Sequence, residues 1–230
     1  AHCIGTGLHS GKKVRLAIHP APANSGIFFV RTDLPRHAII PARFDLVGDT
    51  TLATTLSDGR NTISTVEHLM AALRGLGIDN ARITVDNPEI PIMDGSAWPF
   101  VEALRQAGRS RQNALRTYLR IIRPVELSAG GKTMRAEPGR GFQISCSIHF
   151  DAALIQEQQY SSTITRNTFI KNIAKARTFG YVEQVEELWK RGLALGGSLD
   201  NVVAIHWNRR TILNEGGLRY ADEFIRHKML

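Results

Sequence analysis

The apolar residues change their period within the stretch STVEHLMAAL, residues 64–73. Its apolar residues follow the i, i+3, i+4, i+7 spacing of an amphipathic helix: Val66, Leu69, Met70 and Leu73. Glycine adopts the left-handed conformation that often closes a helix, so we expect this helix to end near Gly75 or Gly77. Before this stretch, apolar and polar residues alternate with period two, which is typical of strands. The chain therefore changes from strand to helix here.

Outward from this helix, the pattern predicts further strands and helices in both halves of the chain. In the first half we expect strands over residues 14–18, 26–30 and 81–85. A second helix should begin at Ser96 or Pro99 and end near Gln106. The polar residues 109–113 are the best candidate linker. In the second half we expect strands over residues 118–122, 132–136, 142–150 and 201–206, and helices over residues 167–177, 185–191 and 220–230.

This order of elements indicates the fold class. Both halves run strands first, then helix, strand and helix, which is a hint of a duplicated α+β unit. We therefore predict an α+β fold with two domains, residues 1–112 and 113–230. A chain of 230 residues is long enough to bury a substantial core in such an arrangement.

Composition and charge narrow the class of protein. Apolar residues make up 43% and charged residues 22% of the chain, which is ordinary for a soluble globular protein. No apolar run approaches the roughly 18–20 residues of a membrane span, so we expect no stable membrane insertion. The net charge of +8 fits either a generic basic surface or an anionic partner such as a phosphate. The basic residues are scattered and lack stacking aromatics, which argues against a nucleic-acid partner.

A carboxylate and two imidazoles form a candidate metal site. Glu67 and His68 open the first helix, and His227 lies in the last predicted helix. These groups are the raw material of a zinc-water site, and a four-coordinate catalytic zinc needs a third protein ligand. On a helix that ligand would lie one turn after His227, at position 231, outside this sequence. Cys3 and Cys146 lack metal-binding spacing and are expected to be free thiols in a reducing compartment, so such a site would depend on His and carboxylate ligands.

Each of these residues also has a purely structural interpretation. Ser64 and Glu67 have the spacing of a capping box, in which the Glu67 side chain bonds the Ser64 amide. His68 and His227 lie off the apolar stripes of their helices, where a histidine is usually solvated. Two such helices, with Glu67 beside one histidine and Lys228 beside the other, favour a site over two exposed histidines.

Two loops carry weaker signals. The glycines between Gly5 and Gly11 could be mistaken for a phosphate loop, but no helix and no Lys-Ser/Thr ending follow them, so a turn between strands is expected. Residues 88–96 form a rigid loop that leads into the second helix. Its Asp94 either forms a turn or orients a ligand, and the sequence leaves both interpretations open.

Several strings, in the same order along the whole chain, are similar to one family of proteins. They are GLHSG (residues 7–11), STVEHL (64–69), PEIPIMDGS (88–96), ARTFG (176–180), LGGS (195–198) and DEFIRHKML (222–230). Together they resemble the UDP-3-O-acyl-N-acetylglucosamine deacetylases of lipid A biosynthesis. This resemblance implies two similar layered α+β domains packed face to face, each with a small insert, which in the second domain covers about residues 180–214. It also implies one Zn²⁺ between the domains and hydrolysis of the substrate's N-acetyl group, which releases acetate.

Matched residue by residue, the resemblance implies a role for each candidate site residue. The zinc ligands fall on His68 and His227, and the general base falls on Glu67. Thr178 and Lys228 match residues that stabilise the oxyanion. The resemblance places six residues against the substrate: Leu8, His9, Leu52, Lys132, Phe150 and Phe179. Of these, Lys132 and Phe150 match positions that hold the diphosphate and the uracil, and Phe179 matches the entrance of the acyl-chain tunnel.

The chain departs from the family pattern at its end. The family's third zinc ligand, an Asp four residues after the second histidine, and its general-acid histidine would both follow Leu230. We therefore expect a C-terminally truncated second domain, weak zinc affinity and little or no turnover. Residues 149–153 also lack the His-Pro pair that the family usually carries near the nucleotide. The alternative function is an inactive binding module that retains the nucleotide-sugar and acyl-chain sites.

The resemblance also implies where such a chain works and with what. The family is mostly bacterial and cytoplasmic, although plants keep a related mitochondrial enzyme. We expect a monomer whose partner is a small nucleotide sugar that carries an acyl chain, with no nucleic acid involved.

Overall fold

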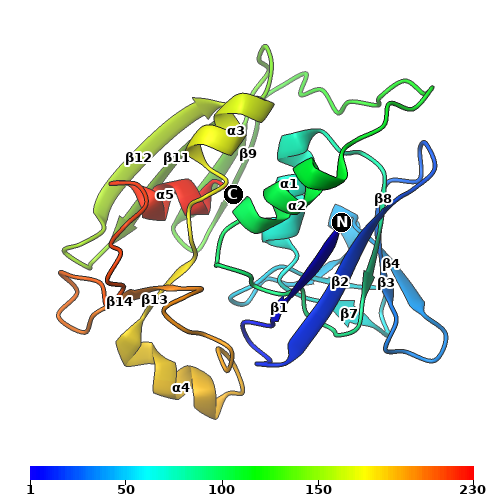
Figure 1. Ribbon diagram of the computed structural model, residues 1–230. Helices are drawn as coiled ribbons and strands as arrows, with labels where there is room; N and C mark the ends of the chain where they lie inside the picture. The colour runs from blue at the N-terminus through cyan, green and yellow to red at the C-terminus, as the bar shows by residue number, and fades with distance from the viewer.

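The computed structural model describes residues 1–230, and a five-stranded sheet forms the centre of its first half (Figure 1). The strands lie in the order β1-β2-β8-β3-β4, with β8 between strands that precede it in the chain. Their bounds are β1 His2–Thr6, β2 Lys13–Pro20, β3 Ile27–Arg31, β4 Ala38–Pro41 and β8 Ala81–Val85. β3 and β8 run parallel, whereas the other neighbours are antiparallel.

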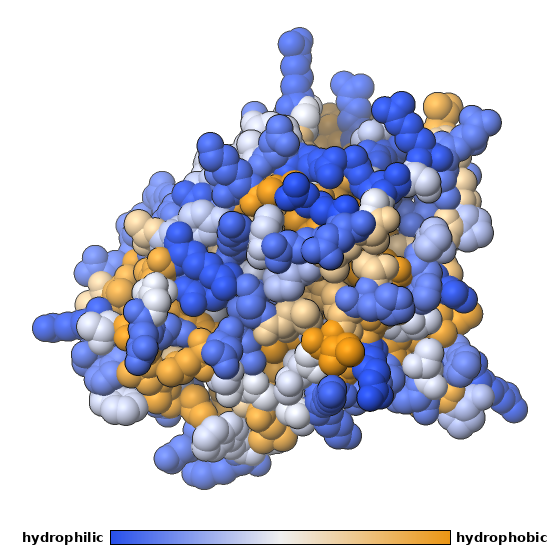
Figure 2. Space-filling view, viewed as in Figure 1, coloured by the Kyte–Doolittle hydropathy of each residue, from blue (hydrophilic) through white to orange (hydrophobic).

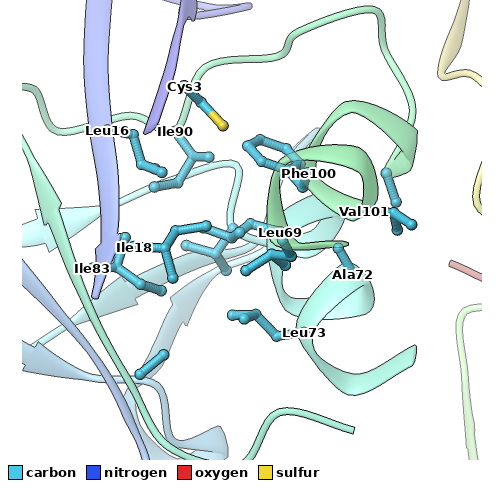
Figure 3. Packing of buried hydrophobic residues seen from close by; sticks show 14 of the residues in the cluster. Cys3, Leu16, Ile18, Leu69, Ala72, Leu73, Ile83, Ile90, Phe100 and Val101 are labelled. Atoms are coloured by element: carbon cyan, nitrogen blue, oxygen red, sulfur yellow. The ribbon is translucent and has the colours of Figure 1, made fainter. Parts of the chain in front are cut away.

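Two helices, α1 (Glu67–Leu76) and α2 (Trp98–Ala107), pack on this sheet. Alternate residues of β2 and β8 are buried, because successive side chains of a strand point to opposite faces. The helices bury their apolar stripes against these strand residues, as Figure 3 shows for Leu69, Leu73 and Phe100. Gly77 ends α1 in the left-handed conformation, as the sequence predicts.

Short elements complete the first half. A 3-10 turn over Phe44–Leu46 leads into a three-stranded sheet of β5 (Val47–Asp49), β6 (Thr55–Ser57) and β7 (Thr62–Ile63). β7 ends at Ile63, and three residues separate it from the start of α1 at Glu67. The loop between β5 and β6 lies against the start of α1, because the Thr54 N–H of this loop donates a hydrogen bond to the Glu67 carboxylate.

The second half contains smaller sheets. Two antiparallel pairs are β9 (Val125–Ala129) with β10 (Lys132–Ala136), and β11 (Gln143–Phe150) with β12 (Gln156–Thr163). A parallel pair is β13 (Phe179–Tyr181) with β14 (Val203–Ile205). The helices are α3 (Arg166–Asn172), α4 (Val185–Lys190) and α5 (Glu223–Lys228), and α5 packs on β11 and β12. A five-stranded sheet like that of the first half is not seen here.

One hydrophobic core cluster joins the two halves. Besides the sheet, α1 and α2, it includes Phe169, Ile173, Ala174 and Met229 from the second half. A smaller cluster lies within the second half and contains Val203, Ile205 and Phe224 together with Ala152 and Ile155. The larger cluster places α3 and the end of α5 against the first half.

Most predicted elements are confirmed, with shifted ends. The strand predicted over residues 81–85 is β8, and that over residues 132–136 is β10. The helix predicted over residues 167–177 is shorter, because α3 ends at Asn172. The strand predicted over residues 118–122 is wrong: this stretch is exposed and irregular, and no strand pairs with it. A strand needs such a partner for its backbone N–H and C=O groups.

On the face seen in Figure 2, hydrophilic side chains are interspersed with patches of apolar ones. Three large apolar residues of the irregular stretch before β9, Leu115, Leu119 and Ile122, are almost fully exposed. None of the helices combines the length and the apolarity that crossing a bilayer requires.

Candidate active site

The start of α1 is built by contacts with distant residues. The predicted capping box is wrong, because Ser64 donates its hydroxyl to the Pro88 carbonyl at 3.2 Å and the helix has no side-chain cap. The Glu67 carboxylate instead accepts the Thr54 N–H at 3.1 Å. Burial raises the pKa of Glu67 above its ordinary value, and the nearby charge of Glu89 adds to that effect. Glu67 is therefore a carboxylate with an enhanced affinity for a proton.

His68 is buried, with 3% of the residue exposed, although it lies off the stripe that faces the sheet. Its Nδ1 atom is buried and has no hydrogen-bond partner. Burial lowers the pKa of His68 to about 3, so the imidazole is neutral at neutral pH. A neutral imidazole with an unpartnered nitrogen can act as a metal ligand or accept a hydrogen bond from a ligand.

His227 of α5 meets His68 from the other half of the chain. The two ring centroids lie 5.2 Å apart and the rings are nearly perpendicular. His227 Nδ1 lies 3.2 Å from the Ala176 carbonyl, which orients the ring and leaves its other nitrogen for a ligand. Burial lowers the pKa of His227 to about 4. Figure 1 shows α5 running toward α1, with the end of the chain between them.

A buried ion pair fixes α5 beside the irregular segment that carries Ala176, just before β13. Glu223 is fully buried and accepts hydrogen bonds from the backbone N–H and the Nε of Arg177, both at 2.9 Å. The same carboxylate accepts the Arg219 N–H at 2.6 Å. These bonds satisfy a charge that would otherwise be costly to bury, and they fix the start of the helix that carries His227.

Aromatic side chains line the site next to His227. The Phe179 ring lies 6.3 Å from that of His227, 5.7 Å from that of Phe150 and 4.9 Å from that of Phe224, as measured between centroids. The Lys228 ammonium lies 5.4 Å from the Phe179 ring centroid. Desolvation and the charge of Lys132 lower the pKa of Lys228. The structure therefore brings Phe150, Phe179 and Lys228 together beside the histidine pair.

Thr178 is positioned by both halves of the chain. Its N–H donates to the Gly95 carbonyl at 2.7 Å, and its carbonyl accepts the Val203 N–H at 2.8 Å. A side chain at position 95 would overlap the Asn201 carbonyl, so a glycine is needed for this close approach. The Asp94 side chain bonds Ser96 as a turn former, and it also pairs with Arg219 at 2.9 Å. Asp94 therefore links the halves and bonds neither histidine.

The remaining predicted substrate residues lie on three segments. Leu8 and His9 form a turn against the second half, where the Leu195 N–H donates to the His9 carbonyl at 3.1 Å and the Gly196 N–H to the Leu8 carbonyl at 3.0 Å. Leu52 is 56% exposed in the loop whose Thr54 bonds Glu67. Lys132 is exposed at the start of β10, close enough to affect the pKa of Lys228.

His68 and His227 are suited to serve as two of the ligands that a zinc ion requires. Burial keeps His68 and His227 neutral, and their ring centroids lie 5.2 Å apart. Within residues 1–230, no cluster of three or more His, Cys, Asp or Glu side chains has the geometry to hold a metal ion. The sequence-based expectation of two histidine ligands therefore remains a prediction that the geometry makes possible.

Comparison with known proteins gives one consistent result. Residues 1–230 match the family model LpxC, described as UDP-3-O-acyl N-acetylglycosamine deacetylase. The chain belongs to the LpxC family. It is 50% identical over 229 residues to the UDP-3-O-acyl-N-acetylglucosamine deacetylase of Shewanella frigidimarina, and 49% over 228 residues to that of Methylococcus capsulatus. Each match covers 98% of this chain and 74% of the relative. The protein with the same name from Coxiella burnetii is 46% identical, over 98% of this chain and 75% of its own length.

This LpxC-family chain also has a pocket beside Phe150 that its sequence did not indicate. The cavity measures about 270 Å³, and its lining includes Asp151, Tyr181, Glu183 and Arg209. Arg209 pairs with Glu183 and lies 5.6 Å from the Tyr181 ring centroid. These residues come from separate segments of the chain, so no local spacing indicated that they meet. The short string around Phe150 was the nearest signal.

Proposed function

We propose that this chain carries the active site of a zinc-dependent deacetylase that removes the N-acetyl group from UDP-3-O-acyl-N-acetylglucosamine in lipid A biosynthesis. Acetate is the product released. The observation that carries this proposal is the 5.2 Å approach of the His68 and His227 rings, with Glu67 adjacent to His68. Membership of the LpxC family supports the same reaction.

His68 and His227 would hold the metal through their ring nitrogens. The bond between His227 and Ala176 fits this role, because a ligating histidine usually bonds a carbonyl through its other nitrogen. A zinc ion bound there supplies a water of lowered pKa, about 7 instead of 15.7, and polarises the amide carbonyl. Two protein ligands are fewer than a catalytic zinc usually has, so we expect weak zinc binding to residues 1–230.

Glu67 would act as the general base. Burial and the charge of Glu89 raise its pKa, which brings its proton affinity closer to that of a base working near neutral pH. Glu67 would take a proton from the attacking water, and the resulting hydroxide would form a bond to the acetyl carbon. Cleavage of the C–N bond would then release acetate, and Glu67 would pass the proton to the departing amine. The Thr178 hydroxyl and the Lys228 ammonium would donate to the oxygen that becomes negative. Each such donor typically contributes about 3–4 kcal/mol.

The substrate would extend from this centre in two directions. Phe179 and the turn of Leu8 and His9 would contact the acyl chain, whose burial contributes about 0.8 kcal/mol for each CH₂ group. Lys132 and Phe150 would contact the diphosphate and the uracil. The basic charge of the chain, +8, favours such an anionic substrate.

A second candidate function is a binding module that retains the substrate site without turnover. One observation favours it: no third metal ligand joins the two histidines within residues 1–230. Such a module would bind the nucleotide sugar but would release no acetate, whether or not zinc is added.

Zinc titration and acetate release test the proposed function. We expect zinc binding by the wild type. His68→Ala or His227→Ala should weaken zinc affinity by more than the roughly 10–100-fold that losing a residue that only orients a ligand costs, because each removes a ligand. Glu67→Gln should retain the zinc affinity of the wild type and abolish the slow acetate release expected of it at saturating zinc, since the variant removes the base alone. His2→Ala, at an exposed histidine of β1, is the matched control.

Two outcomes would contradict parts of this proposal. Unchanged zinc affinity in the double variant His68→Ala/His227→Ala would show that the metal binds elsewhere. Tight binding of the UDP-sugar by the wild type without any acetate release would favour the binding module instead.

A further inference from the structure

Glu89 is a buried carboxylate whose only part in the proposed reaction is the effect of its charge on the pKa of Glu67. It lies in the loop between β8 and α2, and 2% of the residue is exposed. Its carboxylate accepts hydrogen bonds from the His9 N–H at 2.7 Å, from the Ser10 N–H at 2.9 Å and from the Thr65 hydroxyl at 3.3 Å. All three donors are neutral. Hydrogen bonds to an ionised acceptor are stronger than neutral ones, so this carboxylate fixes the groups that donate to it.

The bond from Thr65 to Glu89 fixes the entry to α1, the residues Ser64 to Val66 that come just before the helix. Thr65 has a positive φ of 58°, which is uncommon for a β-branched residue and stores strain of about 1–3 kcal/mol. The Thr65 hydroxyl donates to Glu89. The neighbouring Ser64 bonds the same loop through its backbone: its N–H donates to the Pro88 carbonyl at 2.8 Å, and its carbonyl accepts the Ile90 N–H at 3.0 Å. The strained residue lies two positions before Glu67.

The Glu89 carboxylate also holds the turn of Leu8, His9 and Ser10. The carboxylate bonds two successive amides of this turn, and the opposite side of the turn bonds Leu195 and Gly196 of the second half. The His9 Nε2 atom is buried and has no hydrogen-bond partner. A nitrogen held in this way is available to a ligand. A side chain at Gly7 would overlap the Glu89 carboxylate, so the turn approaches Glu89 as closely as a glycine permits.

We propose that Glu89 is a positioning residue that holds the Leu8–Ser10 turn and the entry to α1 in one fixed arrangement, so that His9 and Glu67 reach the same substrate. The inference rests on the proposed function, because it assumes that both residues serve the UDP-sugar. It adds a residue that touches neither the substrate nor the metal. Glu89 acts through the backbone amides and the hydroxyl that it binds.

The variant Glu89→Gln tests this role while conserving volume. Its amide group keeps one acceptor oxygen and presents an NH₂ group to the second turn amide, which then loses its partner. We expect the His9 and Ser10 amides to exchange hydrogen about tenfold faster, and the affinity for UDP-3-O-acyl-N-acetylglucosamine to fall about tenfold. The affinity for UDP alone should stay the same, because Glu89 bonds none of the nucleotide residues. Glu102→Gln, on the exposed face of α2, is the matched control.

The variant Gly7→Ala is a second test that leaves the charge of Glu89 in place. Its methyl group displaces the carboxylate from the turn, so it should reproduce the faster exchange and the selective loss of affinity. If the wild type binds the acylated UDP-sugar and both variants bind it equally well, the inference is wrong while the proposed function stands. If the wild type fails to bind that UDP-sugar, the proposed function is contradicted and this inference falls with it.

Discussion

Arg31 lies at the end of β3 with 7% of its side chain exposed, and its guanidinium donates two hydrogen bonds to Asp33. A further bond from Arg31 to the Thr62 carbonyl, at 2.6 Å, links this pair to β7. The hydrogen bonds from Arg31 lower the pKa of Asp33, although partial burial opposes that change. A buried guanidinium therefore depends on one carboxylate for much of its stabilisation.

This dependence predicts a change in stability with pH. The pKa of Asp33 is lower in the folded than in the unfolded state, so the unfolded state binds a proton first as the pH falls. The stabilisation is complete above the unfolded value of about 3.9 and is lost as the pH falls through the folded value. We expect Asp33→Asn to lower the free energy of unfolding by about 1–3 kcal/mol at neutral pH.

Urea unfolding of wild type and Asp33→Asn, at neutral pH and near pH 3, measures this change. The difference between the two proteins should shrink at the lower pH. Asp45→Asn is the matched control, since Asp45 pairs with Arg43 in the same way but on the exposed surface, where we expect little effect. A difference that stays constant with pH would show that the charge of Asp33 is not what stabilises Arg31.

At the same scale, the sequence could indicate His68 but not its surroundings. Helical spacing alone places His68 away from the sheet-facing stripe, and the structure has it there, beside His227. The same spacing suggested a capping box at Ser64, whereas the hydroxyl bonds Pro88, which lies on a different segment. Glu89 was seen as part of a rigid loop, because its three donors come from distant residues that no local pattern connects.

At the scale of elements, α1 and α3 pack through a glycine. A methyl group at Gly75 would overlap the ring of Phe169, so the two helices approach more closely than any other residue at position 75 would allow. Glycine lowers helix stability by about 1 kcal/mol relative to alanine. The close packing of a buried aromatic ring more than offsets that cost.

We expect Gly75→Ala to destabilise the protein although alanine is the better helix former. Overpacking typically costs about 1–3 kcal/mol, which exceeds the gain in helix propensity at the upper end of that range. Urea unfolding measures the change, and Phe169→Leu in the same background supplies a double-mutant cycle. The smaller side chain should reduce the penalty of Gly75→Ala. Strictly additive effects would contradict direct packing between the two positions.

Elements with strong internal patterns could be predicted, and those defined by their partners could not. β8 and β10 were predicted with their observed bounds, because both carry clear strand signals between turns. The polar strand β12 was missed, since it is defined by its pairing with β11 and shows no apolar alternation. Residues 118–122 have the composition of a strand, but no neighbouring strand pairs with them.

At the scale of the whole molecule, the larger core cluster makes the two halves depend on each other. Ile173 is 1% exposed and packs in this cluster, although it belongs to the second half of the chain. Ile155 is equally apolar and 3% exposed, but it packs in the smaller cluster. The two isoleucines therefore form a matched pair for testing how far destabilisation spreads.

We expect Ile173→Ala to lower the free energy of unfolding by about 2–5 kcal/mol and to speed hydrogen exchange at Leu69 and Ile83 in the first half. Ile155→Ala should affect these two amides much less. Native-state hydrogen exchange, resolved by residue, distinguishes the two cases. Unchanged hydrogen-exchange rates at the first-half amides in Ile173→Ala would show that the two halves unfold independently.

The predicted α+β class agrees with the mixture of helices and sheets that is observed. The division into two similar domains stays a prediction, since the sheets of the second half do not repeat the five-stranded sheet. Long-range pairing was beyond the reach of residue patterns. The residue types suggested that His68 and His227 form one site, and the family resemblance implied that both bind one metal, but no local pattern indicates that their two helices pack together.

The two histidines of the pair are synthesised at different times during translation. His68 is synthesised well before His227, so a nascent chain carries one member of the pair while residues 69–226 are added. During that time the His68 ring lacks the neighbouring ring that it has in the fold. A fragment that stops before residue 227 therefore carries only one member of the histidine pair.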